Sequence, residues 1–360
     1  TLAGYWNSRI PAIRGYFRKR KAVAWMDKNF FSYHLTKYFA EYLPKQTAAS
    51  PNTIRSYRDT FVQLMEFYKT EYRLPPEKLE YKEFNAERIE SFLVYLEEVR
   101  KVSISTRNQR LAAIHAFFRY LQYRDPAGFE QCAQILAVPL KKSPVKPMNY
   151  MSAEEVRLLF SIPDQKKDDQ LRDLAILVLL YETGARVQEL IDLIPSSIRF
   201  SSTVTAELHG KGNKTRLVPV NADAAAIVRN YIRRCRRINA DEPLFVNRRG
   251  EKLTRAGIQY IIDKNVSTAR RLRPDMFRNR VTNHCFRHSK AMHLLEAGVN
   301  LIYIRDLLGH TSVVTTEIYA KTNPKIKEEQ LKKHSASVET VPKYNKKQKE
   351  DLIDWLKNNL

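Results

Sequence analysis

Cysteine is scarce in this sequence. The 360 residues include only Cys132, Cys235 and Cys285, which lie far apart and form no Cys-x-x-Cys pair. So few cysteines predict neither a disulfide framework nor a standard zinc site, and they are typical of a reducing cytoplasm. A zinc site built by Cys285 with His284 and His288 is an alternative, although this spacing matches no standard pattern. We expect no metal and no other cofactor.

Long apolar runs are also missing. No stretch reaches the length of about eighteen apolar residues that a membrane-spanning helix needs. The N-terminus does not look like a signal peptide, because Trp6, Arg9 and Arg14 interrupt any apolar core. These absences predict a cytoplasmic protein without membrane contact. The length is sufficient for two folded domains.

Acidic residues are outnumbered by basic ones. Lys and Arg total 62 against 39 Asp and Glu, so the formal net charge is +23 at pH 7. A surface this positive attracts polyanions, and counterions released from a nucleic acid would make binding depend on salt. Because ribosomal and membrane-surface proteins are basic as well, the charge predicts a polyanionic partner without saying which one.

Residues 32–123 have the spacing of amphipathic helices. Ser50 followed by Pro51 predicts one helix start, and apolar residues then recur at steps of three and four. The polar faces of these helices carry side chains suited to phosphates and base edges, although a solvated helix face is the alternative for each of them. The candidates for DNA contact are Arg55, Arg107, Asn108, Gln109 and Arg110.

The segments that flank this helical region are basic. Residues 1–31 interleave aromatic and basic side chains, which fits either a helix packed on the next domain or an arm that touches DNA backbone. Residues 124–149 are rich in proline and lysine and predict an interdomain linker. Lys141 and Lys142 in this linker are further candidates for DNA contact.

The second half of the chain predicts an α-rich domain with a small sheet. Ser152 and Glu155 form a capping-box pattern, and Gly184 predicts a helix end. Two short apolar stretches at 204–208 and 217–220 bracket a glycine-containing turn and predict a β-hairpin. Helical patterns resume after the hairpin.

The last part of this half combines phosphate-binding side chains with a phenol. His284 and Arg287 lie three residues apart and so share one helix face, where a guanidinium can bind two phosphate oxygens. His310 follows, and Tyr319 comes last. Taken singly, each of these residues is more often a packing residue than a catalytic one, so their order is the informative feature.

That order resembles the C-terminal signature of the tyrosine recombinases, the phage integrase and Xer family: His-x-x-Arg-His, then Leu-Leu-Gly-His, then Thr-Thr-x-x-Tyr. TGARVQEL at 183–190 resembles the first arginine box of the family, and HGKGNKTRLVPV at 209–220 resembles the hairpin that carries its lysine. The resemblance covers roughly residues 150–325. Residues 32–123 resemble, more weakly, the helical domain with which the family clasps DNA.

The resemblance implies a mainly α fold, with a SAM-like helical core-binding domain and an α-rich catalytic domain that contains a small antiparallel β-sheet. In this family a segment after the tyrosine docks on a neighbouring protomer, and we favour this for the tail over a helix folded back on its own domain. The implied organisation is an N-terminal extension at 1–31, the core-binding domain at 32–123, a linker at 124–149, the catalytic domain at 150–335 and the tail at 336–360.

The resemblance also implies the chemistry. Cleavage of a DNA phosphodiester needs positive donors on the nonbridging oxygens, an acid for the leaving 5′ hydroxyl and a nucleophile. The family forms a 3′-phosphotyrosine without metal or ATP. Transferred residue by residue, its roles make Tyr319 the nucleophile, Lys211 the general acid and Arg186, Arg287, His284 and His310 the phosphate-binding groups.

The roles of four further residues are less defined. Glu189 matches the acidic position of the first box, where it either orients the lysine or a histidine or makes an ordinary helical ion pair. Lys214 and Arg216 contact phosphate or are solvated strand residues. For His288, helix packing is the better interpretation.

We therefore expect a site-specific recombinase that acts on duplex DNA as a homotetramer in the synaptic complex, with accessory proteins as further candidate partners. Two alternatives remain. A type IB topoisomerase shares this chemistry but relaxes supercoils as a monomer. A DNA-binding regulator that has lost catalysis is the second, and the filled catalytic positions argue against it.

Overall fold

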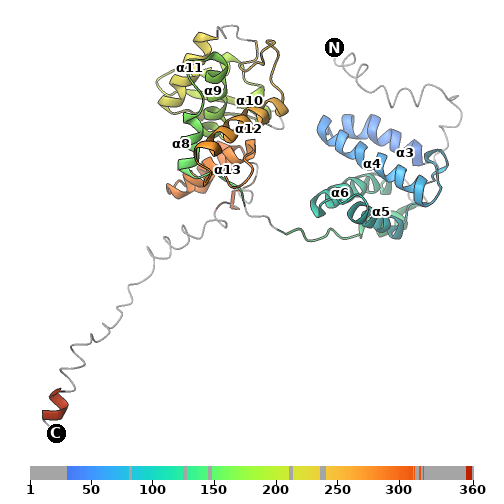
Figure 1. Cartoon of the computed structure of the whole chain (residues 1–360). Coiled ribbons are helices and arrows are strands. Elements are labelled where there is room, and N and C mark those ends of the chain that lie inside the picture. The colour runs from blue at the N-terminus through green and yellow to red at the C-terminus, as the bar shows by residue number, and fades with distance from the viewer. Residues whose placement is uncertain are drawn as a thin grey trace. The chain divides into compact units, whose positions relative to one another are not determined.

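Helices make up most of the structure, a computed structural model that describes residues 31–80, 83–124, 128–144, 148–210, 214–235, 241–310, 312, 316, 317, 319 and 354–358. The chain divides into two units, residues 1–145 and 146–360 (Figure 1). The expected fold, mainly α with a small antiparallel sheet, is confirmed. In the described part of the chain, no helix combines the length and the apolar character that crossing a membrane requires.

The first unit is a helical bundle in which polar side chains cap the helices. The helix α4 (Pro51–Glu71) begins where the sequence predicts: the Ser50 hydroxyl accepts a hydrogen bond from the Thr53 amide at 3.2 Å. Asn85 and Ser103 cap two further helices in the same way. The other elements are α3 (Phe31–Lys37), the π-helix η1 (Tyr38–Gln46), η2 (Pro76–Lys78), α5 (Ala86–Glu98), α6 (Ile104–Gln122) and α7 (Phe129–Leu136).

Aromatic rings fill the core of this unit. The Phe31 ring stacks on that of Phe84 with centroids 4.2 Å apart, and it meets the edge of Phe117 at 5.2 Å. Such pairs stabilise a core by about 0.5–1.5 kcal/mol beyond the apolar area that they bury. Phe31 is fully enclosed, so the residue that we expected to end the N-terminal extension belongs to the helical core instead.

Part of the predicted linker is also folded into the first unit. Within the range 124–149, α7 packs against α5 and α6, and Ile135 is buried between them. The Ile135 carbonyl lies 3.1 Å from the His115 ring on α6. The linker prediction was wrong for these residues, because Gly128 and Pro139 flank a helix rather than interrupt it.

The second unit contains the helix ends that the sequence predicts. Ser152 and Glu155 form a capping box at α8 (Ala153–Ser161). The helix α9 (Asp168–Thr183) ends at Gly184, whose φ of +55° is left-handed. A Cβ at this glycine would lie only 2.7 Å from Leu308. The other elements are α10 (Val187–Ile191), η5 (Pro195–Ser197), β1 (Ile198–Arg199), β2 (Thr205–His209), β3 (Thr215–Pro219), α11 (Ala222–Arg234), α12 (Arg255–Leu272), α13 (Asn283–Glu296) and α14 (Leu301–Leu308).

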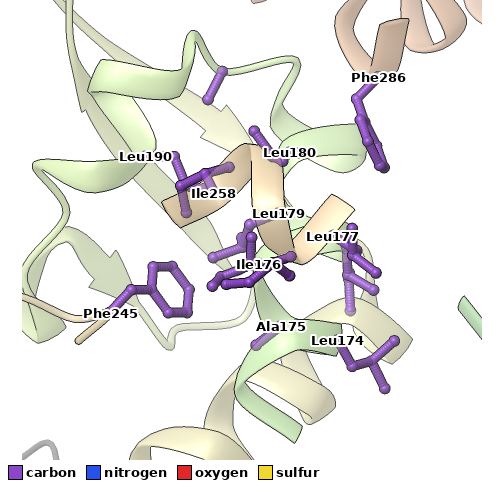
Figure 2. Close-up of a cluster of buried hydrophobic side chains, with 14 of the residues drawn as sticks. Leu174, Ala175, Ile176, Leu177, Leu179, Leu180, Leu190, Phe245, Ile258 and Phe286 are labelled. Carbon is purple, nitrogen blue, oxygen red and sulfur yellow. The ribbon is translucent and has the colours of Figure 1, made fainter. Parts of the chain in front are cut away.

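The helix α9 is central to this unit, and α8, α10, α11, α12 and α13 pack around it (Figure 1). Every residue from Leu174 to Leu180 is buried, so this part of the helix is apolar on all sides, as expected of a helix enclosed by others. Figure 2 shows Leu174, Ala175, Ile176, Leu177, Leu179 and Leu180 with Phe245, Ile258 and Phe286 from other elements. The packed core holds the end of α9 in place, and Arg186 follows two residues after that end.

A three-stranded antiparallel sheet of order β1–β2–β3 completes the unit. The strands β2 and β3 form the predicted hairpin, in which Ala206 lies opposite Val218. The Gly210 amide donates to the Lys214 carbonyl at 2.8 Å and extends the ladder toward the tip. Residues 211–213 at the tip lie outside the described residues.

Candidate active site

Arg287, on α13, lies in the interior of the second unit. It is 4% exposed, and its Nη1 and Nη2 donate to the carbonyls of Gly184 and Leu308, both at 2.7 Å. These carbonyls stand at the ends of α9 and α14, where C=O groups without a helical partner have partial negative charge. Burial, with a smaller contribution from Arg186, lowers the pKa of Arg287 to about 10. The guanidinium therefore stays charged at neutral pH.

Arg186 reaches the same place from the start of α10. Its Nη2 donates to the Gly309 carbonyl at 3.3 Å, next to the Leu308 carbonyl that Arg287 binds. Its Nη1 and its backbone amide donate to the two oxygens of the Glu189 carboxylate, both at 2.8 Å. The Arg186 side chain is 36% exposed and so can be reached from solvent. The two arginines predicted to bind one phosphate thus lie in one cluster.

Arg216, on β3, joins this cluster through Glu189. Its Nη1 and Nη2 donate to the two carboxylate oxygens at 3.0 and 2.7 Å, the forked geometry that a guanidinium makes with a carboxylate. Its Nε donates to the Leu307 carbonyl at 2.9 Å. Each side-chain nitrogen of Arg216 thus has an acceptor within the protein, and the phosphate contact predicted for this residue remains a prediction.

Glu189 is the shared acceptor of the cluster. Burial alone would raise its pKa, but the hydrogen bonds from Arg216 and Arg186 outweigh burial and hold the pKa below its usual value. Of the two roles that we considered, the ion pair within the helix is present, and a second pair links α10 to the sheet.

Replacing Glu189 by glutamine is expected to lower the free energy of unfolding by about 2 kcal/mol near pH 7, because hydrogen bonds to charged groups are worth about 1.5–3 kcal/mol. The folded pKa of Glu189 lies below its unfolded value, so its stabilisation is complete above that unfolded value and is lost as the pH falls through the folded pKa. Thermal scans at decreasing pH measure the effect, and the difference between wild type and variant should shrink toward acid. The control Asp192→Asn, in an exposed pair with Lys252, should change little. A difference independent of pH would contradict the assignment.

Two neutral imidazoles lie beside the arginines. Partial burial of His284, then the charges of Arg287 and Arg186, lowers its pKa below the usual value. Partial burial, then the charges of Arg287, Arg186, Arg216 and His288, lowers the pKa of His310 to about 4. The Nδ1 of His310 lies 3.0 Å from the Thr316 hydroxyl. Each ring is neutral at pH 7 and retains one N–H that can be donated to a phosphate oxygen.

Tyr319 is enclosed in a small apolar cluster that includes Met292, and it is only 2% exposed. Its hydroxyl lies 3.1 Å from Nδ1 of His288, and its ring is nearly parallel to that of His310 with centroids 6.4 Å apart. Burial raises the pKa of the phenol, and the charge of Arg287 offsets this only in part. The phenol is therefore protonated at pH 7, and it is shielded from solvent in this structure.

His288 has a more specific role than the helix packing that we predicted. Its ring is the hydrogen-bond partner of the Tyr319 hydroxyl. Burial, followed by His284 and Arg287, lowers its pKa to about 4, so the ring is neutral and can accept the phenol proton in that bond. The interval of four residues between His284 and His288 was the available signal, because it places both rings on one helix face.

The predicted general acid, Lys211, lies outside the described residues, and its role stays a prediction. The base of its hairpin is described and lies against the cluster: a Cβ on Gly210 would be 3.2 Å from Oε1 of Glu189. On the other side of the tip, the Lys214 side chain is exposed. Its DNA contact remains a prediction as well.

In the first unit, two of the candidate DNA contacts hold the bundle together. Arg107 is buried, donates to the Pro139 carbonyl at 3.1 Å and pairs with Glu97. The Asn108 side chain bonds both the carbonyl and the amide of Lys141, at 2.7 and 3.1 Å. The DNA contact predicted for Arg107 is wrong in this structure, because the side chain is buried. Asn108 is half-buried, and its DNA contact remains a prediction.

The next two residues of α6, Gln109 and Arg110, connect this helix to α4. Nη1 of Arg110 donates to the Ser56 carbonyl at 3.1 Å and to the Thr60 hydroxyl at 3.2 Å, and the DNA contact of this residue remains a prediction. Gln109 is exposed and donates to the Ser56 hydroxyl at 3.1 Å. The DNA contacts of the exposed residues remain predictions, and these residues are Gln109, Arg55, Lys141 and Lys142.

Replacing Arg107 by alanine is expected to destabilise the first unit by about 2 kcal/mol, because it removes a buried side chain and its hydrogen bond to the Pro139 carbonyl, while Glu97 keeps its pair with Lys141. The matched variant Lys142→Ala removes an exposed cation. It should leave stability unchanged but weaken DNA binding and reduce the salt dependence by about one released ion. Calorimetry and binding titrations at several salt concentrations measure the two effects. A loss of DNA affinity in Arg107→Ala without a loss of stability would restore the original prediction.

Cys285 is buried, and its sulfur accepts hydrogen bonds from the Asn149 side chain and the Thr282 amide, both at 3.3 Å. Among the residues that the structure places, no group of three or more His, Cys, Asp and Glu side chains is arranged to hold a metal ion. The alternative of a zinc site at His284, Cys285 and His288 therefore has no support in this arrangement.

Known protein families match the sequence of both units. Residues 149–325 match the phage integrase family, and residues 36–125 match the phage integrase N-terminal SAM-like domain. The putative integrase/recombinase y4rC of Sinorhizobium fredii is 38% identical over 302 residues, which cover 84% of this chain and 90% of that protein. Tyrosine recombinase XerC of Roseiflexus sp. is 31% identical over 292 residues, with 79% and 88% covered. The chain belongs to the phage integrase family of tyrosine recombinases.

Solved structures share the fold. The XerH site-specific recombinase, bound to a palindromic difH substrate in a post-cleavage complex, has a TM-score of 0.63 and 21% identity, with 82% of this chain and 83% of that chain covered. The Tn1549 transposon integrase in complex with transposon right end DNA has a TM-score of 0.64 and 16% identity, with 84% and 99% covered. The predicted tyrosine recombinase fold is thereby confirmed.

Proposed function

We propose that this protein is a site-specific DNA recombinase that cleaves and rejoins duplex DNA through Tyr319. The observation that supports this most directly is the convergence of Arg186 and Arg287 on adjacent carbonyls, immediately before His310. The relatives named integrase/recombinase and tyrosine recombinase support the reaction. The relatives solved with DNA support the substrate.

In the proposed reaction, a DNA phosphate binds beside the exposed Arg186, and the buried charge of Arg287 stabilises the same oxygens. Positive groups fixed in advance in this way favour the transition state, where the oxygens are most negative. The Tyr319 oxygen forms a bond to phosphorus while the bond to the 5′ oxygen breaks. We assign the proton that the 5′ oxygen receives to Lys211. The phenol first leaves its hydrogen bond to His288 and then loses its proton to His284, or loses it because the arginine charges favour the phenolate.

The product is a 3′-phosphotyrosine. Because this ester retains the free energy of the broken phosphodiester, attack by a 5′ hydroxyl of another strand restores a DNA linkage and releases the phenol. The scheme needs no ATP, and each of its proton transfers uses a side chain of the protein.

A nicked suicide substrate tests this function. Cleavage near the nick releases a short strand, so the covalent adduct cannot reverse and accumulates as a slowly migrating band in denaturing gels. Fragments selected from a random duplex pool supply the site. The proposal expects an adduct at the 3′ phosphate, whereas DNA binding without an adduct would indicate a regulator without catalysis.

A second measurement distinguishes a recombinase from the topoisomerase alternative. A monomeric enzyme of that type relaxes supercoiled plasmid that lacks the selected site, whereas a recombinase exchanges strands between two sites. Relaxation by monomers without recombination would overturn the proposal in favour of the topoisomerase.

We also infer that the protein acts in the cytoplasm as a homotetramer on two DNA sites, with accessory proteins, and that the tail at 336–360 docks on a neighbouring protomer. In support, residues 354–358 of the tail are helical and present the exposed apolar side chains of Trp355 and Leu356. Deleting the tail should leave cleavage of a single site intact and prevent tetramer formation on DNA, as measured by light scattering. An unchanged tetramer would exclude the docking role.

A further inference from the structure

Three arginines from three elements bind three consecutive carbonyls where α14 ends. The carbonyls of residues 307–309 accept, in order, from Arg216 at 2.9 Å, Arg287 at 2.7 Å and Arg186 at 3.3 Å. The last carbonyls of a helix have no partner within it, and their partial negative charge suits guanidinium donors. The backbone that leads into His310 is therefore held by all three side chains.

Arg216 is much less accessible to DNA than Arg186, whose side chain is 36% exposed. The Arg216 side chain is 12% exposed, and its Nε, Nη1 and Nη2 all donate to internal acceptors. It also passes directly over Gly309, where a Cβ would lie 3.1 Å from its Cδ and its Nη1. The left-handed φ of +63° at Gly309 and the absence of a side chain there allow this close approach.

Arg216 also balances the charge of Glu189. The carboxylate accepts from Arg186 and Arg216 together, so one negative charge faces two positive ones. With Arg216 present, the site keeps a net positive charge on the solvent-accessible Arg186. Without it, Glu189 and Arg186 would form a neutral pair that attracts a phosphate less strongly.

We propose that Arg216 is a positioning residue for the reaction: it fixes the turn at residues 307–309 and, through Glu189, holds Arg186 in place and keeps its charge available to the scissile phosphate. This inference rests on the proposed function. Arg216 itself does not touch the DNA. Its effect reaches the reaction through the position and charge of Arg186.

The variant Arg216→Lys keeps the charge but cannot bond both carboxylate oxygens and the Leu307 carbonyl from a single ammonium. Misplacement of a catalytic group by about 1 Å can cost about a hundredfold, so we expect the single-turnover cleavage rate on the suicide substrate to fall by about 10- to 100-fold. The Kd for the same DNA should not change. The matched control is Arg199→Lys on β1, an exposed arginine paired with Glu207, and it should cleave at the wild-type rate.

A double-mutant cycle separates positioning from a general loss of structure. In an Arg186→Ala background, Arg216→Lys should have almost no further effect on the cleavage rate, because the residue through which it acts is already absent. If the double variant instead loses cleavage rate by the product of the two single-variant factors, the proposal is overturned. A weakened Kd with a smaller salt dependence would also overturn it, because that result would make Arg216 a phosphate contact.

The same cleavage measurements distinguish failure of the positioning role of Arg216 from failure of the proposed function. If the wild-type protein forms no adduct, the proposed function fails. If the wild type forms the adduct and Arg216→Lys forms it equally fast, only the positioning role of Arg216 fails. Circular dichroism and a melting curve establish that each variant is folded before its rate is compared.

Discussion

The variant Tyr319→Phe is expected to form no covalent adduct with DNA while binding the same DNA as well as the wild type does. The attack needs the phenolic oxygen, and phenylalanine lacks it. The variant ring fits the same enclosed site and loses only the hydrogen bond to His288. Denaturing gels of the suicide-substrate reaction measure the adduct, and a binding titration measures the affinity.

A second phenol provides the control for this experiment. Tyr303 on α14 belongs to the same unit but is exposed, so Tyr303→Phe should form the adduct at the wild-type rate. An adduct that survives in Tyr319→Phe would place the nucleophile on another residue. An adduct lost in both variants would indicate damage to the α14 region instead of removal of the nucleophile.

Alanine variants of Arg287 and Arg186 should both lose cleavage but differ in stability. Loss of one preorganised donor to the transition state costs about 10²- to 10³-fold in rate, and we expect a loss of this size from each variant. Arg287→Ala also leaves the Gly184 and Leu308 carbonyls buried without a donor, which is expected to cost about 3 kcal/mol. Arg186→Ala removes a more exposed side chain, and Glu189 keeps its pair with Arg216, so its cost should be about 1 kcal/mol.

Calorimetry, which can separate the transitions of the two units, compares the stabilities, and single-turnover reactions compare the rates. Cleavage by Arg287→Ala at the wild-type rate would show that its buried guanidinium serves the fold alone. Equal destabilisation by both variants would contradict the difference in burial.

Local patterns were sufficient to predict helix ends and the family. A cap depends on a side chain and an amide three residues later, so Ser50 and Ser152 were identifiable from their neighbours alone. The helix α7 escaped prediction because the residues at its ends, Gly128 and Pro139, are ones that also occur in linkers.

The order of arginines, histidines and tyrosine along the chain was enough to indicate the chemistry and the candidate residues. It could not show which cations face DNA and which hold the fold. Arg107 and Arg216 are of the residue type that contacts DNA. Each instead donates to a backbone carbonyl, that of Pro139 or Leu307, which lies far away in the sequence. Those pairings follow from the packing of distant elements against one another, which brings a backbone carbonyl to each guanidinium. The spacing of residues along a single helix or strand contains no information about that packing. Only the tertiary structure therefore showed which arginines bind acceptors within the protein.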